Sequence, residues 1–199
     1  MIFHMTSKKP LLIVGNGVRA ADATELVYDF VRRTHIPALT TMNGVDLIQD
    51  EYRIGFIGTY GNRIANMILN ECDLVISVGA RLGLRQIGNK KELFAPKAKL
   101  IRVDVDQYEL GRNIKEDEEK YHMDAKYFLE RLLEEDIPDY QAWWNKCREA
   151  KDILEGYDDV EGNLCIDKIA QILPENPIVA VDVGQNECWT AQSLWLKGT

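Results

Sequence analysis

Glycine, arginine and aspartate residues that directly follow apolar runs are the ones whose types and spacing suit phosphate binding. The stretch "LLIVGNGVRAA" contains a G-x-G-x-x-A motif, with Gly15 and Gly17 directly after the apolar run Leu11–Val14. Such glycines let the backbone approach a pyrophosphate, and the amides of the following helix face its negative charge. Tight packing of strand against helix explains the same glycines equally well. A standard NAD dehydrogenase is disfavoured, because the nearest acid after the second strand is Asp46, several residues late for a ribose contact.

Four further polar stretches, "TTMNG", "GTYGN", "GARLGLR" and "VDVD", each come just past the end of a predicted strand or apolar run. In an open α/β sheet, ligands bind along the carboxyl ends of the strands. Arg81 and Arg85 could clamp a phosphate there, and Asp104 or Asp106 could accept hydrogen bonds from a ribose. Taken singly, each of these residues is also typical of an ion-paired surface group or a helix cap.

The sequence shows no catalytic constellation and no metal site. The four cysteines form no CxxC pair and the three histidines are scattered, so zinc is not expected. The formal net charge of −8 leaves no basic field for nucleic acid or an anionic membrane. No apolar run approaches the roughly 20 residues of a membrane helix, and no secretory signal precedes the first strand. We therefore expect a soluble, cytoplasmic protein that binds a small molecule.

The elements that must position these residues alternate between short apolar runs and helix-period segments, which predicts an α/β fold with a parallel sheet. The predicted strands are Leu11–Val14, Ile36–Thr41, Leu74–Val78, Leu100–Val105, a short edge strand Tyr121–Met123, and Ile178–Val183. The predicted helices are Ala20–Arg33, Arg63–Cys72, Ala125–Glu135 with Asp124 as its cap, 139–155, and Leu164–Leu173 with Asn163 as its cap.

The chain has an unusual ending, because "PIVAVDVGQNECWTAQ" is typical of the opening strand, turn and helix of a new α/β domain. We therefore predict a disordered or tag-like N-terminus over residues 1–8 and a Rossmann-like domain over 9–137. A linker helix and loop would follow over 138–162, and the start of another domain over 163–199.

Five stretches in order, "PLLIVGNGVRAADATEL", "IPALTTMNGVDLI", "IGTYGNRIANMILNECDLVISVGARL", "AKLIRVDVDQYELGRN" and "VDVGQNECWTAQ", carry a family resemblance. Together they resemble thiamine diphosphate-dependent enzymes of the acetolactate synthase-like family, over about Lys9 to Leu194. Such enzymes have pyrimidine-binding, central and pyrophosphate-binding domains, and this chain resembles the central domain plus the start of the third. The resemblance implies a six-stranded, mainly parallel sheet of the DHS-like NAD/FAD-binding type with helices on both faces, followed by a linker and a strand–helix stub.

The resemblance also implies a role for the turn after the last predicted strand. Gly184, Gln185 and Asn186 would contact the diphosphate of thiamine diphosphate. Many relatives carry His where this chain has Asn186, and an amide cannot titrate. The activating glutamate and the Mg²⁺-binding G-D-G…N stretch would belong to the other domains, so we expect this segment alone to be inactive. The parent would act on 2-keto acids by carboligation or decarboxylation, as a transferase or lyase, and would form a homodimer or homotetramer.

In this family the central domain carries FAD, an adenine nucleotide, or nothing. The flavin-contact stretches correspond to nine positions here: Gly15, Gly17, Met42, Asn43, Gly61, Arg81, Arg85, Asp104 and Asp124. "GARLGLR" lacks the aromatic residue and the acid pair of flavin-binding members, so FAD is disfavoured and a vestigial or ADP-type site is left open. The alternative is a free-standing nucleotide-binding subunit like that of the carbon monoxide dehydrogenase/acetyl-CoA synthase complex, although the C-terminal stub argues against it.

Overall fold

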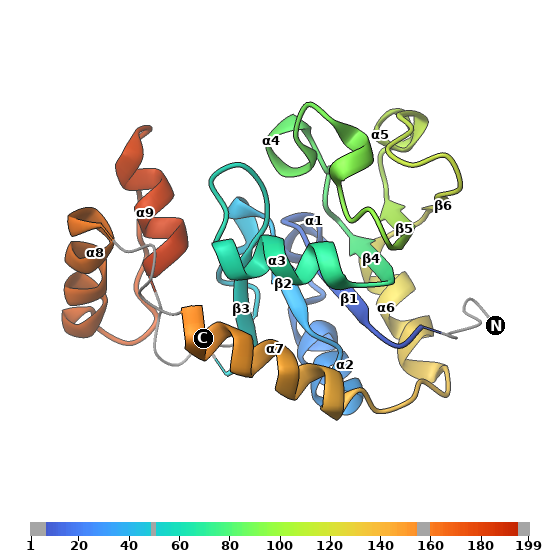
Figure 1. Cartoon of the computed structure of the whole chain (residues 1–199), viewed down its shortest axis with the longest axis horizontal. Helices are drawn as coiled ribbons and strands as arrows, with labels where there is room; N and C mark the ends of the chain where they lie inside the picture. The colour runs from blue at the N-terminus through green and yellow to red at the C-terminus, as the bar shows by residue number, and fades with distance from the viewer. Residues whose placement is uncertain (1–6, 49–50, 155–159, 195–199) are drawn as a thin grey trace.

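All six strands lie in one parallel sheet in the computed structural model, which describes residues 7–48, 51–154 and 160–194 (Figure 1). The strands are β1 (Pro10–Val14), β2 (Ala38–Thr40), β3 (Arg53–Phe56), β4 (Leu74–Val78), β5 (Lys99–Asp104) and β6 (Glu119–His122). Their order across the sheet is β3-β2-β1-β4-β5-β6, and every neighbouring pair is parallel. This order is the doubly wound one, in which the direction of winding reverses between β1 and β4. The predicted α/β, Rossmann-like, six-stranded sheet is confirmed.

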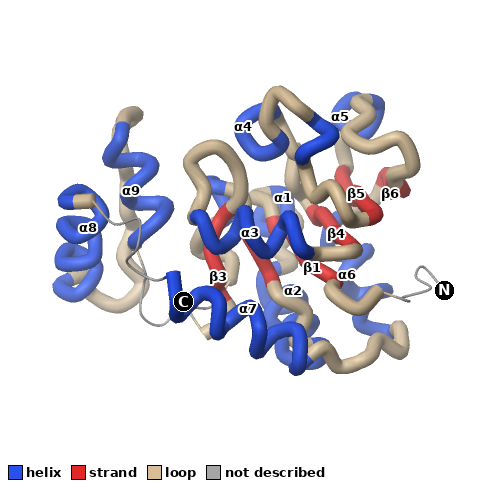
Figure 2. The backbone as a smooth tube through the Cα atoms, in the orientation of Figure 1, coloured by secondary structure: helices blue, strands red, loops and turns tan. Residues whose placement is uncertain are grey.

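Helices cover both faces of the sheet, as the tube view shows (Figure 2). One face carries α1 (Gly17–Ala20), α2 (Thr24–Thr34) and α6 (Ala125–Glu134), and the other carries α3 (Arg63–Glu71) and α7 (Gln141–Leu154). The short elements η1 (Met42–Gly44), α4 (Leu84–Ile87), η2 (Lys91–Leu93) and α5 (Gln107–Gly111) belong to the loops between strands and helices. The chain continues into α8 (Glu161–Ile172) and α9 (Gln185–Ser193).

Two hydrophobic cores result because successive side chains of a strand point to opposite faces. In β1, Leu12 and Val14 belong to the core under α2 and α6, while Leu11 and Ile13 belong to the core under α3 and α7. Strands buried on both faces are apolar without alternation, which is why the β1 and β4 runs were recognisable in the sequence.

Five predicted strands match β1, β2, β4, β5 and β6 with ends shifted by at most two residues, and the helices match α2, α3, α6, α7 and α8 with larger shifts at some ends. β3 (Arg53–Phe56) is not among the predicted strands. This four-residue strand contains Gly55 at φ +150° and pairs with β2 through an irregular register. Because β3 is so short and includes a glycine, its sequence does not show the pattern of apolar residues that predicts a strand.

The predicted last strand is not a strand in the structure. Residues 178–183 belong to no helix and to no strand of the sheet, and Ile178 and Val183 are almost fully exposed. A β-strand needs a neighbour for its backbone hydrogen bonds, and among the described residues no strand pairs with this segment. The helix predicted to follow it is present as α9.

The predicted linker helix packs as part of the sheet unit. Trp144 and Cys147 of α7 are buried in the core beneath α3. Part of the predicted linker loop, 155–159, lies outside the described residues, as do 1–6 of the predicted N-terminal tail. Ser7 and Lys8, the last residues of that tail, are hydrogen-bonded to the carboxylate of Asp73. Within the described parts of the chain, no helix combines the length and the apolar character needed to cross a bilayer.

Candidate functional site

A cleft of about 1150 Å³ lies at the carboxyl ends of the strands. The loops that follow β1, β2, β3, β4 and β5 all contribute to its lining, and Glu187 of α9 closes one side. The cleft spans the point between β1 and β4 where the winding of the sheet reverses. Ligands of open α/β sheets bind at such points, so this cleft is the candidate binding site.

The glycine-rich turn after β1 packs directly against the turn after β4. A Cβ on Gly15 would lie 2.2 Å from the carbonyl oxygen of Gly79, and a Cβ on Gly17 would lie 2.7 Å from the Gly79 Cα. The Gly15 N–H donates to the Val78 carbonyl at 3.0 Å, and the Gly17 N–H donates to the Gly79 carbonyl at 2.9 Å. Both amides thus have protein partners, and the tight packing of the two turns accounts for these glycines.

Three arginines on the cleft wall provide its positive charge. Glu109 bridges two of them: its Oε1 lies 2.7 Å from Arg81 Nε, and its Oε2 lies 2.6 Å from Arg112 Nη2. Arg112 also donates to the Arg81 carbonyl at 2.6 Å. Arg85, on α4, makes no side-chain hydrogen bond or ion pair with any described residue. Arg85 is therefore the cleft arginine most available to an anion.

The aspartates after β5 cap the local backbone. Asp104 accepts a hydrogen bond from the Asp106 N–H at 2.9 Å through Oδ1. Asp106 is the N-cap of α5 and accepts from the N–H groups of Tyr108 and Glu109. In both aspartates Oδ2 accepts no hydrogen bond from the described residues, so either carboxylate could accept from a ribose hydroxyl.

A buried guanidinium fixes the loop that carries these groups. Arg102 of β5 is 2% exposed and donates to the backbone carbonyls of Arg112 and Glu109, both at 2.8 Å. Its Nη1 lies 3.4 Å from the carboxylate of Glu118, which is equally buried. Burial lowers the pKa of Arg102, and the nearby Glu118 carboxylate opposes this effect. The buried contacts hold both ends of the Glu109–Arg112 turn.

The structure brings six of the nine predicted nucleotide-site residues to the cleft. These are Gly17, Met42, Asn43, Arg81, Arg85 and Asp104.

Three predicted residues are not among those that line it. Gly15 is covered by the turn after β4. Gly61 closes the loop after β3, where an added Cβ would lie 2.3 Å from the Phe56 carbonyl oxygen. Asp124 accepts hydrogen bonds from the Lys126 and Tyr127 N–H groups as the N-cap of α6. Close backbone contacts explain the two glycines, and the helix cap explains the aspartate.

Gly184, Gln185 and Asn186 lie at the exposed N-terminus of α9. Gly184 adopts φ +152°, and the Asn186 side chain donates to the Asp182 carbonyl at 3.1 Å. None of the three lines the cleft, but the next residue, Glu187, does. The first turn of α9 therefore lies at the cleft margin, and its first residues are exposed.

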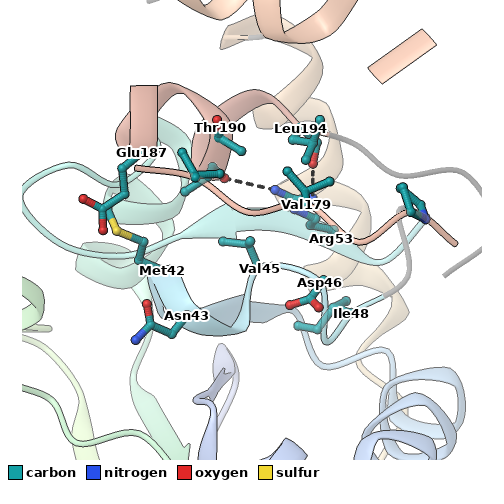
Figure 3. A pocket seen from close by; sticks show the side chains of 13 residues that line it. Met42, Asn43, Val45, Asp46, Ile48, Arg53, Val179, Glu187, Thr190 and Leu194 are labelled. Atoms are coloured by element: carbon teal, nitrogen blue, oxygen red, sulfur yellow. Dashed lines mark hydrogen bonds between the residues drawn. The ribbon is translucent and has the colours of Figure 1, made fainter. Parts of the chain in front are cut away.

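A smaller cavity of about 330 Å³ separates α9 from the β3 edge of the sheet (Figure 3). The buried Arg53 of β3 reaches across to α9, where it donates to the carbonyls of Leu194 at 2.9 Å and Ala191 at 3.1 Å. A cation at a helix C-terminus is stabilised by the carbonyl dipoles. Glu187 lines this cavity as well as the cleft, so α9 connects the two spaces.

Sequence reasoning missed Glu109, Arg112, Tyr60 and Glu187 as cleft residues. The i, i+3 spacing of Glu109 and Arg112 was a usable sign of an ion pair. No local pattern could place Glu187 at the cleft, because its position depends on how α9 docks. The described residues contain no cluster of three His, Cys, Asp or Glu side chains that could hold a metal ion.

Residues 5–132 match the family model described as "Thiamine pyrophosphate enzyme, central domain". The "Probable acetolactate synthase large subunit" of Methanocaldococcus jannaschii is 30% identical, over 96% of this chain and 35% of that protein. The acetolactate synthase isozyme 2 large subunit of Escherichia coli K12 is 31% identical, over 94% of this chain and 35% of that protein. The Corynebacterium glutamicum acetolactate synthase large subunit is 34% identical, over 94% of this chain and 32% of that protein. The chain thus spans about a third of the length of these curated relatives.

Proposed function

The chain belongs to the thiamine pyrophosphate enzymes and contains their central domain. We propose that it is part of a thiamine diphosphate- and Mg²⁺-dependent enzyme that acts on 2-keto acids. The enzyme would be acetolactate synthase-like, a transferase or lyase that makes or breaks a carbon–carbon bond next to a carbonyl. The cofactor supplies the nucleophile and the electron sink when bound. The relatives of this chain support the substrate class, since all three described above are acetolactate synthase large subunits.

Within that enzyme, Gly184, Gln185 and Asn186 would bind the cofactor's diphosphate. Their exposed place at the start of α9 supports this role, because the N–H groups of a first helical turn attract anions. Asn186 could donate a hydrogen bond from its side-chain amide but could not transfer a proton. The activating glutamate and the Mg²⁺ ligands would come from the other domains of the enzyme.

The strand-end cleft would hold an adenine nucleotide of the ADP type. The observation that carries this proposal is Arg85, a guanidinium without an acidic partner among the described residues, in a cleft at the winding reversal of the sheet. Asp104 would accept from the ribose, and Tyr60 offers a half-exposed ring on the same wall. FAD remains disfavoured, because the loop from Gly79 to Arg85 carries neither an aromatic side chain nor an acid pair.

Calorimetric titration of the 199-residue chain separates the two sites. We expect ADP to bind and FAD not to bind. Thiamine diphosphate with Mg²⁺ should bind no more tightly than millimolar, because a helix N-terminus contributes only about 0.3–1 kcal/mol, whereas micromolar affinity requires about 8 kcal/mol. Release of CO₂ from pyruvate by this chain alone, with both cofactors present, would contradict the proposal. Absence of ADP binding would remove the nucleotide site and leave the family role untouched.

A free-standing nucleotide-binding subunit is the second candidate. The observation in its favour is that the cleft is built almost wholly from the sheet domain, with Glu187 as the only described contribution from α9. Such a subunit would bind ADP without any use for Gly184 to Asn186. Replacing these three residues in an enzyme that contains this segment should weaken thiamine diphosphate binding under the first proposal and change nothing under the second.

A further inference from the structure

Glu109 occupies the position in the cleft where an anionic ligand would be expected to bind. Its carboxylate contacts Arg81 through Oε1, and it contacts both Nε and Nη2 of Arg112 through Oε2. Each carboxylate oxygen thus has an arginine partner, and arginine N–H groups bind phosphate oxygens by the same charge-assisted hydrogen bonds. Only 16% of the Glu109 side chain is exposed, whereas 77% of the Arg81 side chain is.

The carboxylate is held firmly in this position. The Glu109 and Arg112 carbonyls both accept hydrogen bonds from the buried Arg102, and Asp106 caps the turn of α5 that contains Glu109. These contacts fix the backbone of the turn, and the ion pairs with Arg81 and Arg112 hold the Glu109 carboxylate itself. Displacement by a ligand would therefore have to move Arg81, the most exposed partner.

The charge of the cleft leads to the same conclusion. Four carboxylates and three guanidinium groups line it among the described residues. Glu109 shares its single negative charge between Arg81 and Arg112, so Arg85 is the cleft arginine without a carboxylate partner among the described residues. Each additional phosphate on a ligand would have to compete with Glu109 for its counter-ion.

We propose that Glu109 is an internal counter-ion that competes with ligand phosphates for Arg81 and Arg112 and so limits how strongly the cleft favours more highly phosphorylated nucleotides. This inference rests on the proposed nucleotide site. It assigns Glu109 the role of a specificity-determining residue, since the competition grows with the charge of the ligand and is absent for an uncharged nucleoside.

The test is a titration of the wild-type chain and of Glu109→Gln with adenosine, AMP and ADP at low ionic strength. Glu109→Gln should bind ADP between about three- and tenfold more tightly, AMP by a smaller factor, and adenosine as the wild type does. Glu130→Gln is the matched control, because it removes an equal charge from an exposed position on α6 that does not line the cleft. It should change the ADP-to-adenosine affinity ratio by less than about twofold.

The outcomes separate this inference from the nucleotide site itself. If ADP binds but the ADP-to-adenosine ratio is the same in Glu109→Gln and the wild type, the site stands and the counter-ion role is overturned. If no variant binds any of the three ligands, both fall. A uniform change for all three ligands would mean a loosened cleft and would also overturn the inference.

A second measurement needs no substitution at Glu109. In the wild-type chain, ADP should shift the Nε–H NMR signal of Arg81, whose Nε donates to Glu109, and adenosine should leave that signal in place. An unchanged Arg81 signal at saturating ADP would count against the competition even if Glu109→Gln failed to fold.

Discussion

At the scale of single residues, burial decides which of the four cysteines can react. Cys72 and Cys147 are buried in the core under α3 and α7, and burial raises the pKa of each thiol to about 12. Burial, together with the negative charge of Glu187, also raises the pKa of Cys188, which is partly exposed. Cys165 is exposed. Since the thiolate is the reactive form, these environments should separate the four thiols clearly.

We therefore predict that iodoacetamide at about pH 8 modifies Cys165 first and Cys188 more slowly, and leaves Cys72 and Cys147 unmodified in the folded chain. Peptide mass spectrometry over a time course measures each rate. In urea all four should react, which is the control for reagent access. Modification of Cys72 or Cys147 at the rate of Cys165 would show that the core under α3 and α7 is accessible to the reagent.

Asp73 fastens the chain that leads into β1. Its carboxylate accepts hydrogen bonds from the Ser7 hydroxyl, from the Lys8 N–H at 2.8 Å and from the Lys9 N–H at 3.0 Å. Burial alone would raise the pKa of Asp73, but these hydrogen bonds outweigh it and hold the pKa below the ordinary value of 3.8. A depressed pKa stabilises the folded state above the unfolded value, and this stabilisation is lost as the pH falls through the folded value.

The wild type should accordingly unfold at higher urea concentration than Asp73→Asn at about pH 6, and the difference should shrink towards about pH 3. Asp29→Asn is the control, because Asp29 forms an exposed i, i+3 pair with Arg32 whose removal should have little effect at either pH. A difference between wild type and Asp73→Asn that stayed constant with pH would contradict the assigned role of the carboxylate.

At the scale of elements, α9 depends on one side chain of a strand far away in the sequence. The two Nη atoms of Arg53 bind the carbonyls at the C-terminal end of α9, and Asn62 and Tyr60 add contacts to Gln192. Hydrogen bonds from a charged donor are worth about 1.5–3 kcal/mol each. Most of the docking of α9 onto the β3 edge should therefore come from Arg53.

Arg53→Met should weaken this docking by on the order of 3 kcal/mol, and the amides of α9 should exchange faster with deuterium while those of β1 and β4 keep their protection. Arg148→Met, an exposed position on α7, removes an equal charge as the control. Unchanged exchange in α9 would show that other contacts, such as the packing of Trp189 against Gly162, hold the helix.

The elements that sequence could predict were those with a local signal. β1 and β4 are five-residue apolar runs, and the N-cap Asp124 marks the start of α6. β3 could not be predicted because it has only four residues and one of them is Gly55. Residues 178–183 were mistaken for a strand because their pattern is right but a neighbouring strand is lacking among the described residues. In both cases the outcome depends on pairing, which sequence spacing alone does not contain.

At the scale of the whole molecule, the cleft depends on loops from five strands, so a ligand that fills it should stabilise the entire sheet. An ADP concentration about 100-fold above Kd would add about 2.7 kcal/mol to the free energy of unfolding. For a chain of this size the corresponding rise in Tm is roughly 5–10 °C. Thiamine diphosphate should give no resolvable rise.

Differential scanning fluorimetry measures this shift. Arg85→Met should abolish the rise with ADP, because it removes the arginine without an acidic partner, and Arg148→Met should retain it. A full ADP shift in Arg85→Met would place the nucleotide away from Arg85.

How far the cleft could be predicted follows from the same geometry. Arg81, Arg85 and Asp104 were predictable because the carboxyl ends of parallel strands share one edge. The engagement of Arg81 by Glu109 was not, because it depends on the conformation of the α5 turn, which Arg102 sets from within the sheet. Sequence could therefore indicate where a ligand would bind but not how the charges there are already paired.

The contact between the turns after β1 and β4 has a consequence for how the protein can vary. Gly15, Gly17 and Gly79 leave no room for a single methyl group between two backbones, so the spacing of the halves of the sheet is set by main-chain atoms. Substitutions at these three positions would force the two halves of the sheet apart. Substitutions of the surrounding arginines and carboxylates would leave the sheet intact. During evolution, such domains could therefore change the ligand that they bind, or lose ligand binding altogether, through substitutions of the charged cleft residues alone.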